Sequence, residues 1–289
     1  MRYLKYSVFV LILLVSLNCL LYAEGTGDAA AAAYTAGDLL YKLGKPAEAL
    51  DCFDKAIKAD DKYIDAYYAK GLALMDLGRY YEAISSFDKV IQLNDKYKDT
   101  YLKKGIALSA VNRYDESIQC FEKMLTIDPK CKDAYLQKGI ALYYQKKSLD
   151  AVASFDKAIE LDSNYVEAYY NKGVALTDIR KYDEALKCFD TAAKIDDKNK
   201  FVYYYRSLCL LAAGRYGDSL NVINKAIELD PQFGDAYFCK ACICAVVNKP
   251  KEAVESLKKA VEIDRKFIQY AKDVKVFNNI IPPDGFDKL

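Results

Sequence analysis

Small and aromatic residues recur along most of this chain at a fixed interval of 34 positions. The first series consists of small residues: Gly37, Gly71, Gly105, Gly139, Gly173, Ser207 and Ala241. A second series, later in each unit, holds a large apolar side chain: Phe53, Phe87, Phe121, Phe155, Phe189, Ile223 and Leu257. Because the register continues from Ala30 to Phe267 without an insertion, the chain is predicted to be an array of equal structural units.

The spacing inside each unit predicts two helices. In one unit, Tyr67, Gly71 and Leu74 are four and three residues apart, which places them on one helical face. Ala83 and Phe87 have the same relation in the second half of the unit. A small residue on each helix allows the two backbones to approach closely, and the ring beside it fills the remaining space. The sequence therefore predicts an all-α fold of helical hairpins.

Turn residues separate the predicted helices. Leu77-Gly78-Arg79 and Ala213-Gly214-Arg215 stand between the two helices of a unit. Asp128-Pro129 and Asp230-Pro231 end the second helix. Elsewhere, Asp60-Asp61, Asp162-Ser163 and Asp196-Asp197 are expected to cap the helix that follows.

We predict seven units, followed by a helix that covers the end of the array. The units are residues 30–63, 64–97, 98–131, 132–165, 166–199, 200–233 and 234–267. Residues 268–281 keep an apolar spacing but lack the small residue, so they are predicted to form a capping helix. Residues 282–289 are predicted to be a loose tail.

The N-terminal segment is expected to direct export and to lie outside the repeats. Arg2 and Lys5 precede an apolar run, and Leu21-Tyr22-Ala23 before Glu24 resembles a cleavage site. Residues 1–23 are thus a signal peptide or an uncleaved membrane anchor, and Cys19 leaves a lipoprotein as a third reading. Residues 24–29 are a linker. The expected location is periplasmic, extracellular or tethered to the outer face of the cytoplasmic membrane.

On these residues the chain resembles the tetratricopeptide repeat family, whose signature places Tyr, Gly, Ala, Phe and Ala at these offsets. The resemblance implies a right-handed superhelical solenoid of antiparallel helix pairs. The chain departs from the signature where a basic residue replaces the leucine before the small residue: Lys70, Lys104, Lys138, Lys172, Arg206 and Lys240. These side chains are expected to cover apolar surface and to reach the carboxylates five residues earlier.

The resemblance also implies that the first helix of each pair lines a concave groove that binds a peptide. Carried over to this chain, the groove positions provide apolar and aromatic candidates: Tyr34, Tyr68, Leu102, Leu136, Tyr143, Tyr144, Tyr170, Tyr204 and Phe238. They also provide an acidic border: Asp65, Asp99, Asp133, Glu167 and Asp235. The family's best-known mode clamps a carboxylate with basic residues, but this composition favours an apolar segment flanked by Lys or Arg.

The overall charge gives no reason to expect nucleic acid as a partner. Forty-two basic residues oppose 41 acidic ones, which leaves a formal charge of +1. A protein or a peptide is the expected partner, membrane association would come from residues 1–23, and the oligomeric state stays open. The leading hypothesis is an exported, non-catalytic scaffold, and the alternative of the same class is a membrane-tethered assembly factor or co-chaperone.

An enzyme is the alternative from a different class. The chain has no histidine, which removes the usual general base and the commonest metal ligand. Cys239, Cys242 and Cys244 are close in sequence, but on a helix Cys242 and Cys244 point to different faces. Cys52, Cys120 and Cys188 recur in alternate units, too far apart to pair with one another. We therefore expect no cofactor, no metal and no catalytic residue, with a thiol- or metal-dependent enzyme as the remote alternative.

Overall fold

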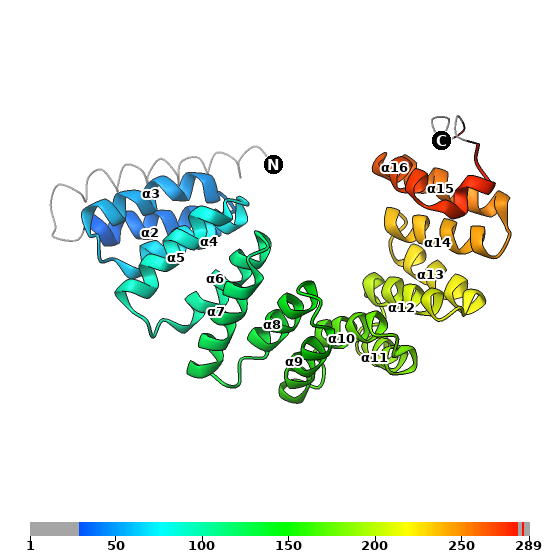
Figure 1. The fold of residues 1–289 in the computed structure, drawn as a ribbon. Helices are drawn as coiled ribbons and strands as arrows, with labels where there is room; N and C mark the ends of the chain where they lie inside the picture. The colour runs from blue at the N-terminus through cyan, green and yellow to red at the C-terminus, as the bar shows by residue number, and fades with distance from the viewer. Residues whose placement is uncertain (1–28, 283–284, 286–289) are drawn as a thin grey trace. The chain divides into compact units, whose positions relative to one another are not determined.

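The computed structural model describes residues 29–282 and 285, and these residues form helices without strands (Figure 1). The predicted signal or anchor (1–23), most of the linker and most of the tail lie outside the described residues. The helices are α2 (Ala29–Lys42), α3 (Pro46–Ala59), α4 (Ile64–Asp76), α5 (Tyr80–Leu93), α6 (Lys98–Ala110), α7 (Tyr114–Ile127), α8 (Lys132–Tyr144), α9 (Ser148–Leu161), α10 (Val166–Asp178), α11 (Tyr182–Ile195), α12 (Lys200–Ala212), α13 (Tyr216–Leu229), α14 (Gly234–Val246), α15 (Pro250–Ile263) and α16 (Lys266–Asp273), followed by the 3₁₀ helix η1 (Lys275–Asn279).

The described residues divide into two compact units, and the boundary between Ala141 and Leu142 lies within α8. In the first unit α2 packs on α3, α4 on α5 and α6 on α7, and the pairs follow one another in chain order. In the second unit α10 packs on both α9 and α11, α12 on α13 and α14 on α15, in the same sequential manner. Each unit is therefore a solenoid of antiparallel helix pairs, as the repeat pattern predicts.

The turn inside each hairpin requires one residue in the left-handed conformation. Gly44, Gly78 and Gly214 have φ values of +74°, +71° and +75° there. The equivalent positions without glycine take φ values near +60° as well: Asn112, Lys146, Arg180 and Asn248. The next N–H bonds back to the last turn of the first helix, for example Arg79 N to the Leu74 carbonyl over 2.8 Å. This is the hydrogen bond of a Schellman helix end, so the geometry of the turn is kept even where glycine is absent.

The acidic residues between hairpins close turns rather than cap helices. Asp60 Oδ1 accepts a hydrogen bond from Lys62 N over 2.9 Å, and Asp162 and Asp196 accept in the same way from the residue two positions on. The residues at the following N-caps, such as Tyr63 and Tyr165, make no capping hydrogen bond with their side chains. The expectation that these aspartates cap the next helix was wrong: as Asx turns, they order the connection before the helix begins.

The core of each hairpin is a glycine facing a phenylalanine ring. A Cβ atom added to Gly71 would lie 2.4 Å from Phe87 Cε1, and one added to Gly105 would lie 2.5 Å from Phe121 Cε1. Where a Cβ is present, the facing side chain is smaller: Ser207 is matched by Ile223 and Ala241 by Leu257, all fully buried. The two positions therefore share one fixed volume between the helices.

Serine at these small positions remains satisfied by hydrogen bonds across the hairpin. Ser219 Oγ donates to the Ser207 carbonyl over 2.8 Å, and Ser207 Oγ donates to the Ser219 carbonyl over 3.0 Å. Ser117 Oγ likewise donates to the Gly105 carbonyl over 2.8 Å. A buried hydroxyl is tolerated here because the close approach of the two helices brings a carbonyl within reach.

After α15 the chain covers the end of the second unit with two short helices. Residues 268–281, predicted to be one capping helix, include part of the eight-residue helix α16 and the whole of η1, with Val274 between them in an extended conformation. Phe267, Ala271, Phe277 and Ile281 are buried in the same cluster as residues of α14 and α15. The segment thus covers the apolar side of the last hairpin by folding back on it.

Gly71→Ala should lower the free energy of unfolding by about 1–3 kcal/mol, because the new methyl group overlaps the Phe87 ring and overpacks the hairpin. Chemical denaturation followed by circular dichroism measures this change.

Adding Phe87→Leu to Gly71→Ala should restore part of the loss, because the pair then matches Ala241 and Leu257. Additive effects of the two substitutions would show that these positions do not share one space.

Candidate protein-binding face

The aromatic candidates on the first helices lie in the seams between successive hairpins. Tyr34 lies 5.3 Å from Tyr63 between ring centroids, and Tyr68 lies 5.1 Å from Tyr97. In the second unit, Tyr204 lies 5.2 Å from Phe233 and Phe238 lies 5.4 Å from Phe267. In each pair the second ring comes from the last residue of a predicted repeat. These rings therefore pack adjacent hairpins against each other.

Burial in these seams changes the acidity of the phenols. The pKa of Tyr68 is raised to about 12, first by burial and then by the nearby Asp99 carboxylate. Burial likewise raises the pKa of Tyr34 and of Tyr204. These hydroxyls stay protonated across the physiological range and can act as hydrogen-bond donors at the rim of an apolar ring.

The three candidates from the middle of the chain differ in exposure. Leu136 is only 5% exposed and has little surface left for a partner. Leu102 is half-buried against the cluster of Tyr101 and Met124. Tyr170 is half-buried and stacks on Tyr205, with ring centroids 5.9 Å apart and an angle of 5° between the rings.

The most exposed aromatic candidate lies at the end of α8. Tyr144 is 58% exposed, whereas its neighbour Tyr143 is half-buried and meets it edge to face at 5.8 Å. Sequence analysis missed Tyr205, which contacts both Tyr170 and Tyr204. The uninterrupted run Tyr203-Tyr204-Tyr205 was the available signal, since three successive residues of a helix cover more than half of its circumference.

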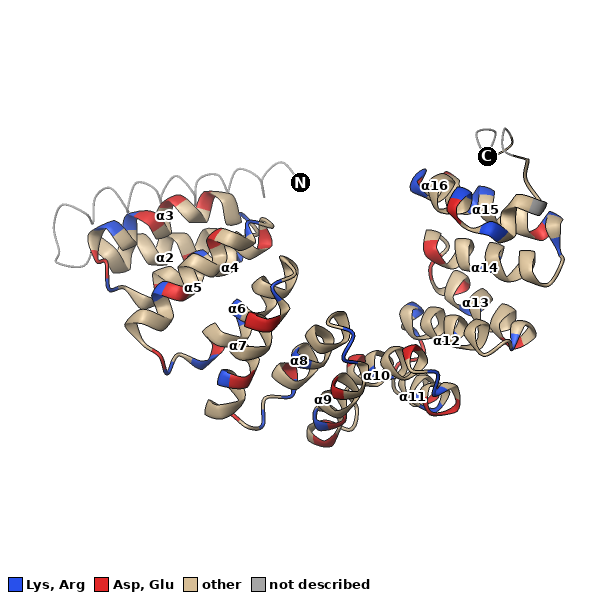
Figure 2. Ribbon diagram, viewed as in Figure 1, with Lys and Arg blue, Asp and Glu red and all other residues tan. Residues whose placement is uncertain are grey.

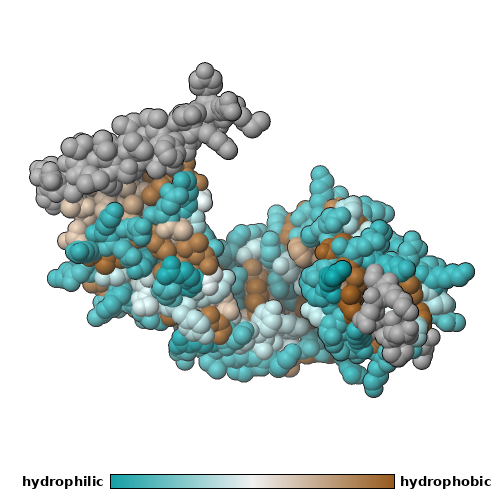
Figure 3. All heavy atoms as spheres, turned by 90° about the horizontal axis from the view of Figure 1, so that it is seen from above, coloured by the Kyte–Doolittle hydropathy of each residue, from teal (hydrophilic) through white to brown (hydrophobic). Residues whose placement is uncertain are grey.

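The acidic candidates are exposed, apart from Asp235, which is half-buried. Tyr97 Oη donates to Asp65 Oδ1 over 3.3 Å, so this carboxylate also borders the aromatic seam. In Figure 2 much of α12 and α14 is uncharged, with the acidic residue of α14 near its start. On the face drawn in Figure 3, hydrophobic residues (brown) lie among hydrophilic ones (teal).

The basic residues before the small positions have other partners than expected. Five of the six bond a carboxylate sixteen residues earlier, on the second helix of the preceding hairpin. The pairs are Lys70–Asp54, Lys104–Asp88, Lys138–Glu122, Lys172–Asp156 and Arg206–Asp190, at 2.5–2.8 Å. The expectation that these heads reach the carboxylates five residues earlier was wrong. The acidic border is therefore not neutralised by these five side chains.

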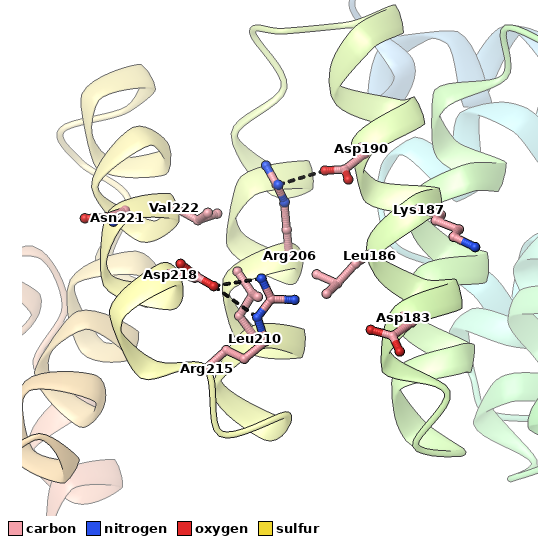
Figure 4. A pocket seen from close by; sticks show the side chains of 10 residues that line it. All are labelled: Asp183, Leu186, Lys187, Asp190, Arg206, Leu210, Arg215, Asp218, Asn221 and Val222. Atoms are coloured by element: carbon pink, nitrogen blue, oxygen red, sulfur yellow. Dashed lines mark hydrogen bonds and ion pairs between the residues drawn. The ribbon is translucent and has the colours of Figure 1, made fainter.

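A hollow of about 590 Å³ lies between α11, α12 and α13 (Figure 4). Two of its basic groups are paired, since Arg206 bonds Asp190 at 2.8 Å and Arg215 bonds Asp218 at 2.7 Å. With Lys187 and Asp183, the lining has three basic and three acidic side chains. Leu186, Leu210 and Val222 form its apolar part. The hollow therefore has little unbalanced charge with which to recognise a ligand.

The cysteines have the environment of packing residues. Burial raises the pKa of Cys120 to about 11 and of Cys239 and Cys242 to about 12. Such thiols are protonated near neutral pH, which is the opposite of what a nucleophile needs. Among the described residues, no group of three or more Cys, Asp or Glu side chains is placed to hold a metal ion. Within the same part of the chain, no helix has the length and apolar character needed to span a bilayer.

The geometry defines a helical-hairpin repeat protein with an aromatic and acidic face on its first helices. Tetratricopeptide repeat models match residues 34–97, 99–131, 142–179, 166–199 and 234–267, which together cover more than half of the chain. The chain therefore belongs to the tetratricopeptide repeat family. The comparison with curated proteins found no match.

Solved structures share the fold at low sequence identity. A tetratricopeptide repeat protein from Parabacteroides merdae is 15% identical with a TM-score of 0.71, over 81% of this chain and 93% of that one. The C-terminal part of a repeat protein from Cytophaga hutchinsonii is 19% identical with a TM-score of 0.63, over 82% and 98%. MamA from Desulfovibrio magneticus is 21% identical with a TM-score of 0.56, over 59% and 96%. These similarities concern the fold alone.

Cys239 and Cys242 should react with iodoacetamide at pH 8 at least about 10³-fold more slowly in the folded chain than in urea, because a pKa near 12 leaves almost no thiolate. Time-resolved alkylation followed by peptide mass spectrometry measures the two rates. Fast modification of either thiol in the folded chain would contradict this assignment and revive a thiol-dependent activity.

Proposed function

We propose that this chain is a non-catalytic scaffold that binds a segment of another protein along the first helices of its repeats. The observation that carries the proposal is the exposed tyrosine at the end of α8, beside half-buried aromatic rings and bordered by carboxylates. Aromatic side chains provide a large contact area at a small entropic cost, which suits them as anchors. Membership of a family built for protein interaction supports the same conclusion.

The charge of this face favours a partner segment that combines apolar anchors with Lys or Arg. Asp65, Asp99, Asp133 and Glu167 are exposed on the first turns of their helices. The lysines nearest in sequence to the small positions are bound to the preceding hairpins instead. A segment ending in carboxylates would meet repulsion on this border, whereas a basic segment would be attracted to it.

We further propose that the scaffold is composed of seven repeats and acts outside the cytoplasm. The 34-residue recurrence from Ala30 to Phe267 supports the number of repeats, and the basic start and apolar run before Ala23 support export. The acidic border would then be directed to partners in the same compartment.

Replacing Tyr144 with the photo-crosslinking residue benzoylphenylalanine should produce adducts in cells, because this exposed ring lies on the proposed face. Tyr81, which is 69% exposed on the second helix α5, is the matched control and should produce few. Mass spectrometry of the adducts should map to a segment rich in apolar and basic residues. Adducts at position 81 with none at 144 would place binding on the second helices and end the proposal.

Mass spectrometry of the chain purified from its native host should find a mature N-terminus at Glu24, because Leu21-Tyr22-Ala23 has the small residue that signal peptidases require. A chain that retains Met1 and fractionates with membranes would favour the anchor, and one that retains Met1 in the cytosol would contradict export.

A further inference from the structure

Four tyrosines of the second unit lie on α8, α10 and α12, which are the first helices of three successive repeats. Tyr143 and Tyr144 close α8, Tyr170 lies on α10 and Tyr205 lies on α12. Tyr170 and Tyr205 are stacked with centroids 5.9 Å apart, while Tyr143 and Tyr144 meet edge to face at 5.8 Å. α10 and α12 also contact each other directly.

The two pairs lie close enough to interact with each other. The pKa of Tyr205 is raised mainly by burial and then by the phenols of Tyr170, Tyr144 and Tyr143. The phenols of both pairs are thus coupled electrostatically through Tyr205, although the four residues come from three successive hairpins. We call Tyr143, Tyr144, Tyr170 and Tyr205 the tyrosine cluster.

Carboxylates adjoin this cluster. The pKa of Tyr143 is raised first by burial and then by Asp178, whose Oδ2 accepts a hydrogen bond from Ser148 Oγ over 2.6 Å. Burial is the main cause that raises the pKa of Tyr170 and of Tyr205, and the carboxylates of Glu167 and Asp235, respectively, add to it. Negative charge beside the electron-rich faces of aromatic rings produces a local potential that attracts a cation.

The same chain already uses this chemistry for one of its own lysines. Lys200 Nζ lies 5.1 Å from the centre of the Phe201 ring and 4.8 Å from that of Phe233, while it forms an ion pair with Asp230. Two rings and a carboxylate therefore hold one ammonium group at the start of α12. The tyrosine cluster has rings and carboxylates of this kind, and Tyr144 leaves more than half of its side chain open to solvent.

We propose that the tyrosine cluster is a docking site for an arginine side chain of the bound protein segment. Arginine fits better than lysine because its planar guanidinium stacks on an aromatic face while its N–H groups bond to carboxylates. The proposal rests on the proposed function and adds to it the position at which the basic part of the partner binds.

Fluorescence anisotropy with two synthetic peptides tests the proposal on the full chain. The probe is fluorescein-labelled Leu-Arg-Leu-Arg-Leu-amide, and the control peptide has citrulline, which is neutral and nearly isosteric, in place of arginine. The arginine peptide should bind about tenfold more tightly, as expected for a cation held by rings and a carboxylate.

Substitutions at one exposed ring then locate the effect. Tyr144→Leu should reduce the preference for arginine several-fold, because it keeps apolar volume but removes the π face. Tyr144→Phe should retain the preference, and Tyr81→Leu on α5 should leave it unchanged. Circular dichroism of each variant verifies that the fold is intact.

Equal affinity for the two peptides, or no measurable binding of the arginine peptide, would overturn the arginine site. An arginine preference that Tyr144→Leu does not alter would overturn its position. Either result leaves the wider proposal standing if benzoylphenylalanine at position 144 still captures a partner, so the two failures are distinguishable.

Discussion

The close approach of the two helices in each hairpin is the constraint on which the rest of the structure depends. Gly71 and Gly105 have no side chain because the rings of Phe87 and Phe121 occupy the space where a Cβ would lie. Each hairpin is a thin element whose remaining apolar surface can be buried only against the next hairpin. A hairpin that opened by the width of a methyl group would misplace the first helix, and with it every side chain on the proposed binding face.

Between hairpins, packing and charge act at different positions. The rings that close the seams, such as Tyr68 on Tyr97, stabilise the stack by burial. The ion pairs of the basic residues before the small positions, such as Lys70 to Asp54, join the first helix of one hairpin to the second helix of the previous one. Exposed ion pairs of this kind contribute little stability each. Their greater effect is to occupy the basic heads, so that these do not neutralise the acidic border.

The fold was largely predictable because the same spacing of small and aromatic residues recurs in each repeat. The spacing between Gly and Phe predicted the helix pairs. The sequence also shows that, in one repeat, Ser207 stands in place of glycine and Ile223 in place of phenylalanine. What the pattern could not show was the direction of long side chains. Asp60 closes a turn instead of capping a helix, and Lys70 turns towards the preceding hairpin. Both choices depend on contacts between units, which a period in one unit does not encode.

The repeat pattern also predicted only part of the candidate protein-binding face. Motif offsets identified Tyr170 and Tyr204, but they passed over Tyr205, because it lies one position beyond the groove register while its ring lies against both of them. Residues at the recurring positions pack successive hairpins together, as Tyr204 does by contacting Phe233. Tyr144, at the end of α8 and outside the recurring positions, is instead 58% exposed. In a repeat protein, the departures from the consensus are therefore where recognition of a particular partner can be encoded.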